Sequence, residues 1–216
     1  LGLNYFRLKQ YDKMINAYKR AIALKPDFSD AHYNLGMAYY YRNMYEDAIK
    51  ELNKAKELNP SDASTFSLLA QAKSAAYESH LSKGTLYYTS EEYVKALEEF
   101  KLALSASPGD NVAKRYLEKT KEAIKNEIPK HLKRAEEYYK NKNYTLAYSE
   151  WEKVLMMDKN NYKAKEGIKK IEKNLSELIK AREERAMSYE KKGLYTDALN
   201  EYMEIKRIAP KSKKKK

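Results

Sequence analysis

Three histidines, His32, His80 and His131, are the side chains of this sequence best suited to bind a metal ion or to move a proton. They recur at equivalent positions of a repeated helical pattern, which is described below. Equivalent positions in successive repeats lie too far apart to hold one ion at the short distances that metal ligands need. We therefore expect no metal site, and we expect each histidine to pack where two helices meet.

The other residues that could do chemistry are not arranged for it. Aspartate and glutamate are abundant, but their spacing pairs them with lysines on exposed helix faces, as in Glu91, Glu92 and Lys95. The sequence has no glycine-rich phosphate loop and no nucleophile elbow. The absence of cysteine excludes disulfides, thiolate metal sites and cysteine nucleophiles, and leaves the redox compartment open. We expect a protein that is not an enzyme and that has no cofactor.

The chain is basic, with 43 Lys and Arg residues against 31 Asp and Glu residues and a net charge of +12. Five lysines lie in a basic tail at 211–216, so about +7 remains for the rest of the chain. A surface of solvated lysines accounts for this excess. The alternative is a partner of opposite charge, such as an acidic protein, a nucleic acid or an anionic membrane surface.

The sequence leaves the cellular compartment open between the cytoplasm and a bacterial periplasm or cell envelope. No apolar run approaches the ~18 residues that a membrane-spanning helix needs. No signal or transit peptide is visible. The chain begins with Leu1 rather than Met, inside a repeat, so we expect a fragment from which an N-terminal targeting segment has been lost.

The elements that carry these residues are predicted to be helices. Abundant Lys, Glu and Ala and a total of only six glycines favour helix throughout. The clearest unit, 30–60, reads as two helices joined by a turn. Close packing between the two helices is expected at Leu35, Gly36, Tyr39, Ala48, Leu52 and Ala55, and Pro60 ends the second helix.

This unit resembles the tetratricopeptide repeat (TPR), a 34-residue helical hairpin with an aromatic residue, Leu-Gly, Tyr, Ala, a large apolar residue and Pro at fixed positions. His32 and Leu52 replace two of its aromatic residues. The pattern returns with a tyrosine at Tyr5, Tyr39, Tyr87, Tyr138 and Tyr189, and with Met14, Ala48, Ala96, Ala147 and Ala198 in the second helix. The resemblance implies an all-α fold, an α-solenoid of about five TPR helical hairpins.

The last three repeats are longer than the family pattern. Ala96 follows Ala48 by 48 residues, and each of the next two steps is 51, where the ordinary step is 34. The added residues precede the Leu-Gly position and continue one apolar stripe, which predicts elongated first helices at 62–89, 111–140 and 162–192. The residue pairs 61–62, 109–110 and 160–161 are expected to cap them.

The predicted repeats differ in length and in the direction of their helices. Pro129 removes a backbone hydrogen bond, so we expect a kink or a short break at 126–129. An insertion of 17 residues turns the helix face by roughly 100°, so we expect the later repeats to be re-angled. The first predicted repeat, 1–28, is truncated at its N-terminus, and the second spans 29–62. The third repeat, 63–110, has a long first helix, the fourth, 111–161, has a long kinked first helix, and the fifth spans 162–210.

The resemblance also implies a binding surface, because in TPR proteins the residue after the signature tyrosine faces a concave groove. The groove residues expected here are Leu3, Phe6, Tyr33, Met37, Tyr40, Tyr41, Leu81, Thr85, Tyr88, Leu132 and Tyr139. Tyrosines give rigid apolar contacts and hydroxyl groups that meet a peptide backbone. The alternative is that these tyrosines cover neighbouring helices in the altered packing.

One well-known TPR site is absent. Co-chaperone TPRs hold a C-terminal carboxylate with lysine, arginine and asparagine side chains. Asn34 matches one of these, but Leu3, Leu81 and Thr85 stand where the others are needed. A receptor for chaperone tails is therefore not expected.

We predict a scaffold or assembly adaptor that binds a hydrophobic peptide or helix of another protein through the tyrosine-rich groove. The first alternative is an electrostatic adaptor for nucleic acid or an anionic membrane surface, with peripheral membrane contact and no transmembrane segment. The second is a component of a bacterial cell-envelope or organelle-assembly complex.

Overall fold

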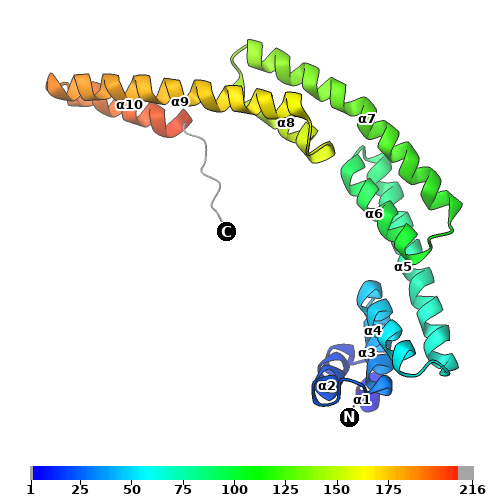
Figure 1. The fold of residues 1–216 in the computed structure, drawn as a ribbon. Helices are drawn as coiled ribbons and strands as arrows, with labels where there is room; N and C mark the ends of the chain where they lie inside the picture. Colours follow the sequence, from blue (N-terminus) through cyan, green and yellow to red (C-terminus); the bar gives the residue numbers. More distant parts are fainter. Residues whose placement is uncertain (1, 209–216) are drawn as a thin grey trace. The chain divides into compact units, whose positions relative to one another are not determined.

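A computed structural model describes residues 2–208 of the chain, with side chains from 4 to 206. The predicted basic tail at 211–216 and the side chain of Leu3 lie outside the described residues. The described residues form ten α-helices joined by short turns (Figure 1). The helices are α1 (Gly2–Arg7), α2 (Tyr11–Leu24), α3 (Ser29–Tyr41), α4 (Tyr45–Leu58), α5 (Ala63–Thr89), α6 (Tyr93–Ala106), α7 (Asn111–Lys140), α8 (Tyr144–Met157), α9 (Tyr162–Lys191) and α10 (Tyr195–Ile208).

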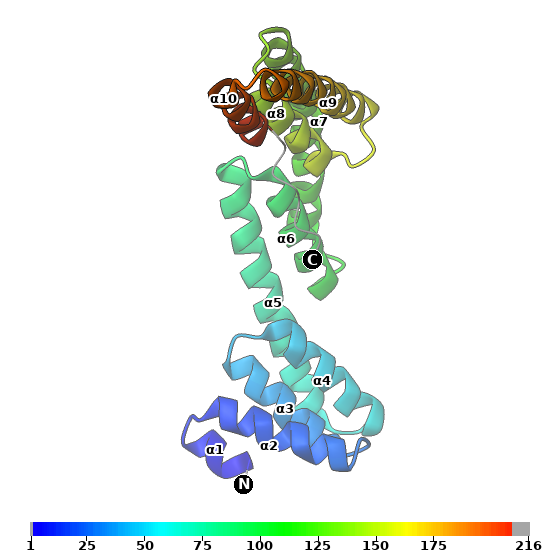
Figure 2. The ribbon, with the colours of Figure 1, turned by 90° about the vertical axis from the view of Figure 1, so that its left-hand side faces the viewer.

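The helices pair in chain order into five hairpins, which we number 1 (α1–α2) to 5 (α9–α10). The predicted all-α solenoid is confirmed, and so are the elongated first helices of hairpins 3, 4 and 5. In Figure 2, the first half of α5 lies against hairpin 2 and its second half continues to α6. The long first helix therefore packs on the preceding hairpin along its first half and on its own partner helix along its second half.

The chain divides into two compact units, 1–123 and 124–216. The first holds hairpins 1 to 3 and the start of α7, and its core includes Met14, Leu35, Leu52 and Leu69. The second holds the rest of α7 and hairpins 4 and 5, and its core is built from residues such as Trp151, Val154 and Ile171. In both units the core is a seam of apolar side chains between paired helices.

The starts of the long helices follow from their capping residues. The Asp62 carboxylate accepts hydrogen bonds from the backbone N–H groups of Ser64 and Thr65. Asp110 accepts one from Ala113 at 2.7 Å, and the Asn161 side chain one from Ala164 at 3.2 Å. Each cap satisfies N–H groups that a helix start leaves without an intrahelical partner.

The break predicted at 126–129 is wrong, because α7 runs unbroken through Pro129 from Asn111 to Lys140. A proline inside a helix costs one backbone hydrogen bond, which a long helix tolerates when both of its ends are packed. Here α7 packs through Tyr116 near its start and through Tyr139 near its end. None of the described helices is both long enough and apolar enough to cross a membrane.

The two helices of a hairpin approach closely at the predicted small residues. A Cβ atom placed on Gly36 would lie 2.7 Å from Leu52, and one on Gly84 would lie 2.6 Å from Phe100. Ala48, Ala96 and Ala147 are fully buried, and Ala198 is 3% exposed. A larger side chain at any of these positions would have to push two helices apart.

Candidate peptide-binding surface

The predicted groove aromatics form a repeated contact at the hairpin turns. In hairpins 1 to 4 the aromatic ring that follows the signature tyrosine packs on the tyrosine that begins the second helix, with ring centroids 5.5–6.2 Å apart. The four pairs are Phe6–Tyr11, Tyr40–Tyr45, Tyr88–Tyr93 and Tyr139–Tyr144. The first-helix rings of these pairs are half-buried, and the contacts stabilise their own hairpins.

An aromatic cluster forms where hairpins 1 and 2 meet. The Tyr41 ring stacks on Tyr11 at 5.5 Å with an angle of 8° between the ring planes. It also lies 5.3 Å from Phe6 and 5.5 Å from Tyr40. Tyr41 remains 47% exposed. The cluster presents a rigid aromatic surface to solvent, because its rings hold one another in place.

Tyr33 and Met37 lie on α3, beside this cluster, and both are half-buried against the core of the first unit. Burial raises the pKa of the Tyr33 hydroxyl, and the negative charges of Asp62 and ionised Tyr41 raise it further. Tyr33 therefore keeps its proton at neutral pH and can donate a hydrogen bond. We refer to Phe6, Tyr33, Met37, Tyr40 and Tyr41 together as the N-terminal aromatic patch.

The α5 residues of the predicted groove are placed differently. Tyr88 lies against Tyr116 of α7, with ring centroids 6.1 Å apart, so it partly covers the next helix as the alternative interpretation expected. The Thr85 hydroxyl donates to the carbonyl groups of Leu81 and Ser82 within its own helix. Leu81 is half-buried.

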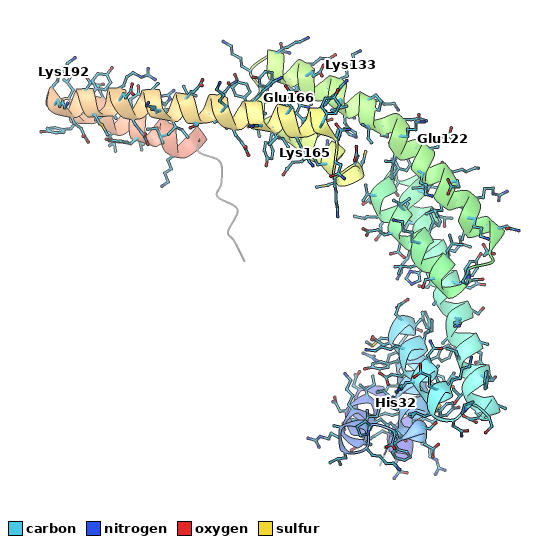
Figure 3. The ribbon with its side chains drawn as sticks, viewed as in Figure 1. His32, Glu122, Lys133, Lys165, Glu166 and Lys192 are labelled. Atoms are coloured by element: carbon cyan, nitrogen blue, oxygen red, sulfur yellow. The ribbon has the colours of Figure 1, made fainter. Side chains whose placement is uncertain are left out.

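The last two groove residues, Leu132 and Tyr139, belong to the second unit, and both pack against its core. The Tyr139 hydroxyl accepts a hydrogen bond from the side-chain amide of Asn174 at 2.9 Å. Tyr139 also lines a cavity of about 320 Å³, whose other lining residues are Glu136, Lys140, Trp151, Tyr162, Lys163, Glu166, Gly167 and Lys170. Figure 3 labels Glu166 on the first part of α9. This cavity was not predicted, because its walls come from three helices.

The histidines pack where helices meet, as predicted, and are at most 9% exposed. Figure 3 places His32 among the packed helices of the first unit. Each imidazole Nδ1 lies 2.7 Å from the carboxylate of a glutamate 19 residues later, in the pairs His32–Glu51, His80–Glu99 and His131–Glu150. In hairpin 5, Arg182 replaces histidine and donates to Glu201 at 2.7 Å over the same spacing.

The sequence interpretation missed these glutamates, although a signal was available, since an acidic residue recurs 19 positions after each histidine. The pairs join the first helix of a hairpin to its second, so their role is structural. Among the described residues, no three His, Asp or Glu side chains gather closely enough to hold a metal ion.

Comparison with known proteins supports the repeat assignment. A TPR repeat model matches residues 2–41, and a second tetratricopeptide repeat model matches residues 29–62. No curated protein matches the chain.

Similar solved structures include two TPR proteins and MamA. A thermophilic TPR protein from Thermus thermophilus is 19% identical, with 98% of this chain and 90% of that chain covered and a TM-score of 0.36. MamA is 17% identical, with 96% and 94% covered and a TM-score of 0.32. The second TPR domain of human RPAP3, solved with an HSP70 peptide, is 27% identical, with 56% and 88% covered and a TM-score of 0.34.

TM-scores of this size do not support an inference about the function or the binding partner of this chain. The repeat matches over residues 2–62 have a direct counterpart in the later hairpins, where the same tyrosine and alanine positions recur. Residues 2–62 of the chain are therefore tetratricopeptide repeats.

Proposed function

We propose that this chain is a non-catalytic scaffold that binds a hydrophobic peptide or helix of a partner protein at the N-terminal aromatic patch. Helical repeat proteins use the extended surfaces of their stacked hairpins for binding. The observation that carries the proposal is the aromatic cluster in which Phe6 and Tyr40 both pack on Tyr41, while Tyr41 stays 47% exposed.

The physical character of the patch favours a peptide over a small charged ligand. Its side chains are aromatic or apolar, and ring contacts already fix their orientation, so little conformational entropy is lost when a partner binds. Tyr33 and Tyr41 add hydroxyl groups that can bond to a peptide backbone. Aromatic side chains of this kind dominate the binding energy of protein interfaces.

A peptide selection would test the proposal. A library of 16-residue peptides is selected on the immobilised chain, and the affinity of a selected peptide is then measured by fluorescence anisotropy. Tyr41→Ala is expected to weaken binding by about thirtyfold, the effect of losing about 2 kcal/mol at an aromatic anchor. Leu86→Ala is the matched control, because Leu86 is 63% exposed on α5 outside the patch.

The dependence of binding affinity on salt concentration distinguishes this proposal from the electrostatic alternative. Binding at an apolar patch changes little between 50 and 500 mM salt, whereas binding to several phosphates weakens steeply. Deletion of residues 211–216 is expected to leave peptide affinity unchanged. An affinity that survives Tyr41→Ala but falls with salt and with the tail deletion would favour the electrostatic adaptor.

A further inference from the structure

The last helix, α10, carries an exposed apolar stripe. Tyr195, Leu199, Tyr202 and Met203 are 72%, 56%, 38% and 61% exposed. Their spacing of four, three and one residues places them on one side of a helix. We call these four residues the α10 stripe.

Equivalent residues of the earlier hairpins are covered. Tyr202 lies four positions after Ala198, and the residues four positions after the equivalent alanines are Leu52, Phe100 and Trp151. Leu52 and Phe100 are fully buried and Trp151 is 4% exposed. Met203 is apolar where the earlier hairpins have Asn53, Lys101 and Glu152. The stripe is therefore both less covered and wider than its counterparts.

The next first helix covers each of these counterparts. Phe100 stacks on Tyr116 of α7 with ring centroids 5.2 Å apart. Trp151 packs so closely on Gly167 of α9 that a Cβ atom at that glycine would overlap the indole ring. Leu52 shares its core with Leu68 and Leu69 of α5.

The three covering helices share one feature, and α7 and α9 share a second. Each has two residues seven positions apart that are at most 2% exposed, in the pairs Thr65–Ala72, Ala113–Thr120 and Ala164–Ile171. The first halves of α7 and α9 are also rich in lysine, with Lys163, Lys165, Lys169 and Lys170 in α9. Lys165 is labelled on this part of α9 in Figure 3. In α7 and α9, the helix that packs on the equivalent surface is therefore basic and amphipathic. It has a small residue at the start of its contact face.

The surroundings of the α10 stripe suit a basic helix. Glu183 and Glu190 of α9 lie near the Tyr202 hydroxyl, whose pKa is raised by burial and by the negative charge of these two carboxylates. Asp197 adds a carboxylate in the first turn of α10.

We propose that the α10 stripe is a second interaction surface, which binds a basic amphipathic helix of a partner protein. The partner helix takes the place that α7 and α9 take on the hairpins before them. Its small residue sits over Tyr202 and its lysines reach Glu183 and Glu190. This surface lies on hairpin 5 and is distinct from the N-terminal aromatic patch.

The chain itself supplies a probe for the test. A fluorescein-labelled peptide with the sequence of residues 160–176 reproduces the part of α9 that covers α8. We expect saturable binding of this peptide to the full chain. Leu199→Lys and Met203→Lys are each expected to weaken binding at least tenfold. Both side chains are more than half exposed, so these variants keep their fold, which circular dichroism verifies.

Matched controls define the site. Leu86→Lys, an equally exposed position on α5, is expected to leave the affinity unchanged, as is Tyr41→Ala in the N-terminal aromatic patch. A peptide with Ala164→Glu is expected to bind at least tenfold more weakly, because the glutamate occupies the fully buried small position.

Three results would overturn the proposal. The first is an absence of saturable binding up to about 1 mM peptide. The second is binding that is unchanged by both α10 substitutions, which would mean that the peptide displaces its own copy from α8. The third is a concentration-dependent dimer of the chain alone that Leu199→Lys abolishes in sedimentation, which would make a second copy the occupant.

Discussion

At the residue scale, one pair of polar side chains recurs in four hairpins with a fixed spacing of 19 residues; it is part-buried in three of them and buried in hairpin 4. Glu150 is the most enclosed carboxylate of the set, at 7% exposure, and it contacts His131, Arg134 and Lys153. Burial alone would raise the pKa of Glu150, but hydrogen bonds and charge from Lys153 and His131 outweigh it and hold the pKa below its ordinary value of 4.5. The carboxylate is therefore ionised and stabilising at neutral pH.

The stability contributed by Glu150 is expected to depend on pH. Its pKa is lower in the folded state than in the unfolded state, so its contribution is complete above about pH 4.5 and is lost as the pH falls through the lowered pKa. Glu150→Ala is expected to cost about 2 kcal/mol or more at pH 7, because it leaves a buried histidine without its partner. Urea unfolding at pH 7 and pH 3 measures both effects. A difference between wild type and variant that stays equal at the two pH values would contradict this account.

The close contact between Gly84 and Phe100 makes a second residue-scale prediction. Gly84→Ala is expected to destabilise the chain by about 1–3 kcal/mol, because the new methyl group overlaps a fully buried ring. The double variant with Phe100→Leu is expected to lose less than the sum of the two single changes. Thermal unfolding of the four proteins provides the measurement, and strict additivity would show that the two residues do not compete for space.

At the element scale, all five hairpins turn through the same backbone conformation. One residue in each turn has a positive φ, and the five are Lys9, Asn43, Glu91, Lys142 and Gly193. The residue that follows the positive-φ residue donates its N–H to the carbonyl group of the signature tyrosine, as Met44 does to Tyr39 at 3.0 Å. This bond closes the end of the first helix in the manner of a Schellman motif.

Gly193 allows a clean test of the turn. Its φ is +74°, and a Cβ atom there would meet nothing within 4 Å. Gly193→Ala is therefore expected to cost about 1 kcal/mol through backbone strain alone. Gly109→Ala is the matched control, because that position is equally open and has no positive φ. Equal thermal midpoints for the two variants would show that the left-handed backbone conformation of Gly193 does not cause the loss of stability.

At the scale of the whole molecule, the contacts within each unit join helices that are close in the sequence, such as α4 with α5 and α8 with α9. Stability of such an array is close to a sum of hairpin and nearest-neighbour terms. The two buried cores lie in separate units, one around Leu35 and Leu52 and the other around Trp151 and Ile171. Damage in one hairpin is therefore expected to remain local.

Ala198→Trp tests this locality, because the alanine is 3% exposed and the new ring forces α9 and α10 apart. Hydrogen exchange is expected to accelerate in α10 and the second half of α9, while α3 and α4 keep their protection. Ala48→Trp is the reciprocal variant and is expected to reverse the pattern. Faster exchange throughout the chain in either variant would show that the array unfolds as one cooperative body.

Much of the fold could be predicted from the sequence, because it depends on local periodicity. Helical spacing of apolar residues revealed the long first helices, and Asp62 and Asn161 marked where two of them start. Alanine at the repeated second-helix position indicated where two helices touch. The short break expected near Pro129 does not occur, because the loss of one hydrogen bond is a local cost whereas the packing that holds α7 extends along the helix.

Only the tertiary structure decided which of these patterned residues are free to bind. Tyr88 and Tyr40 occupy the same repeat position, but Tyr88 lies against Tyr116 of the next helix. Tyr202 and Trp151 also share a position, yet Trp151 is covered by α9 and Tyr202 is 38% exposed. The sequence determined the hairpins because each is set by neighbours within a few turns. Exposure depends on whether another helix packs on a given face, which the pattern within one repeat does not encode.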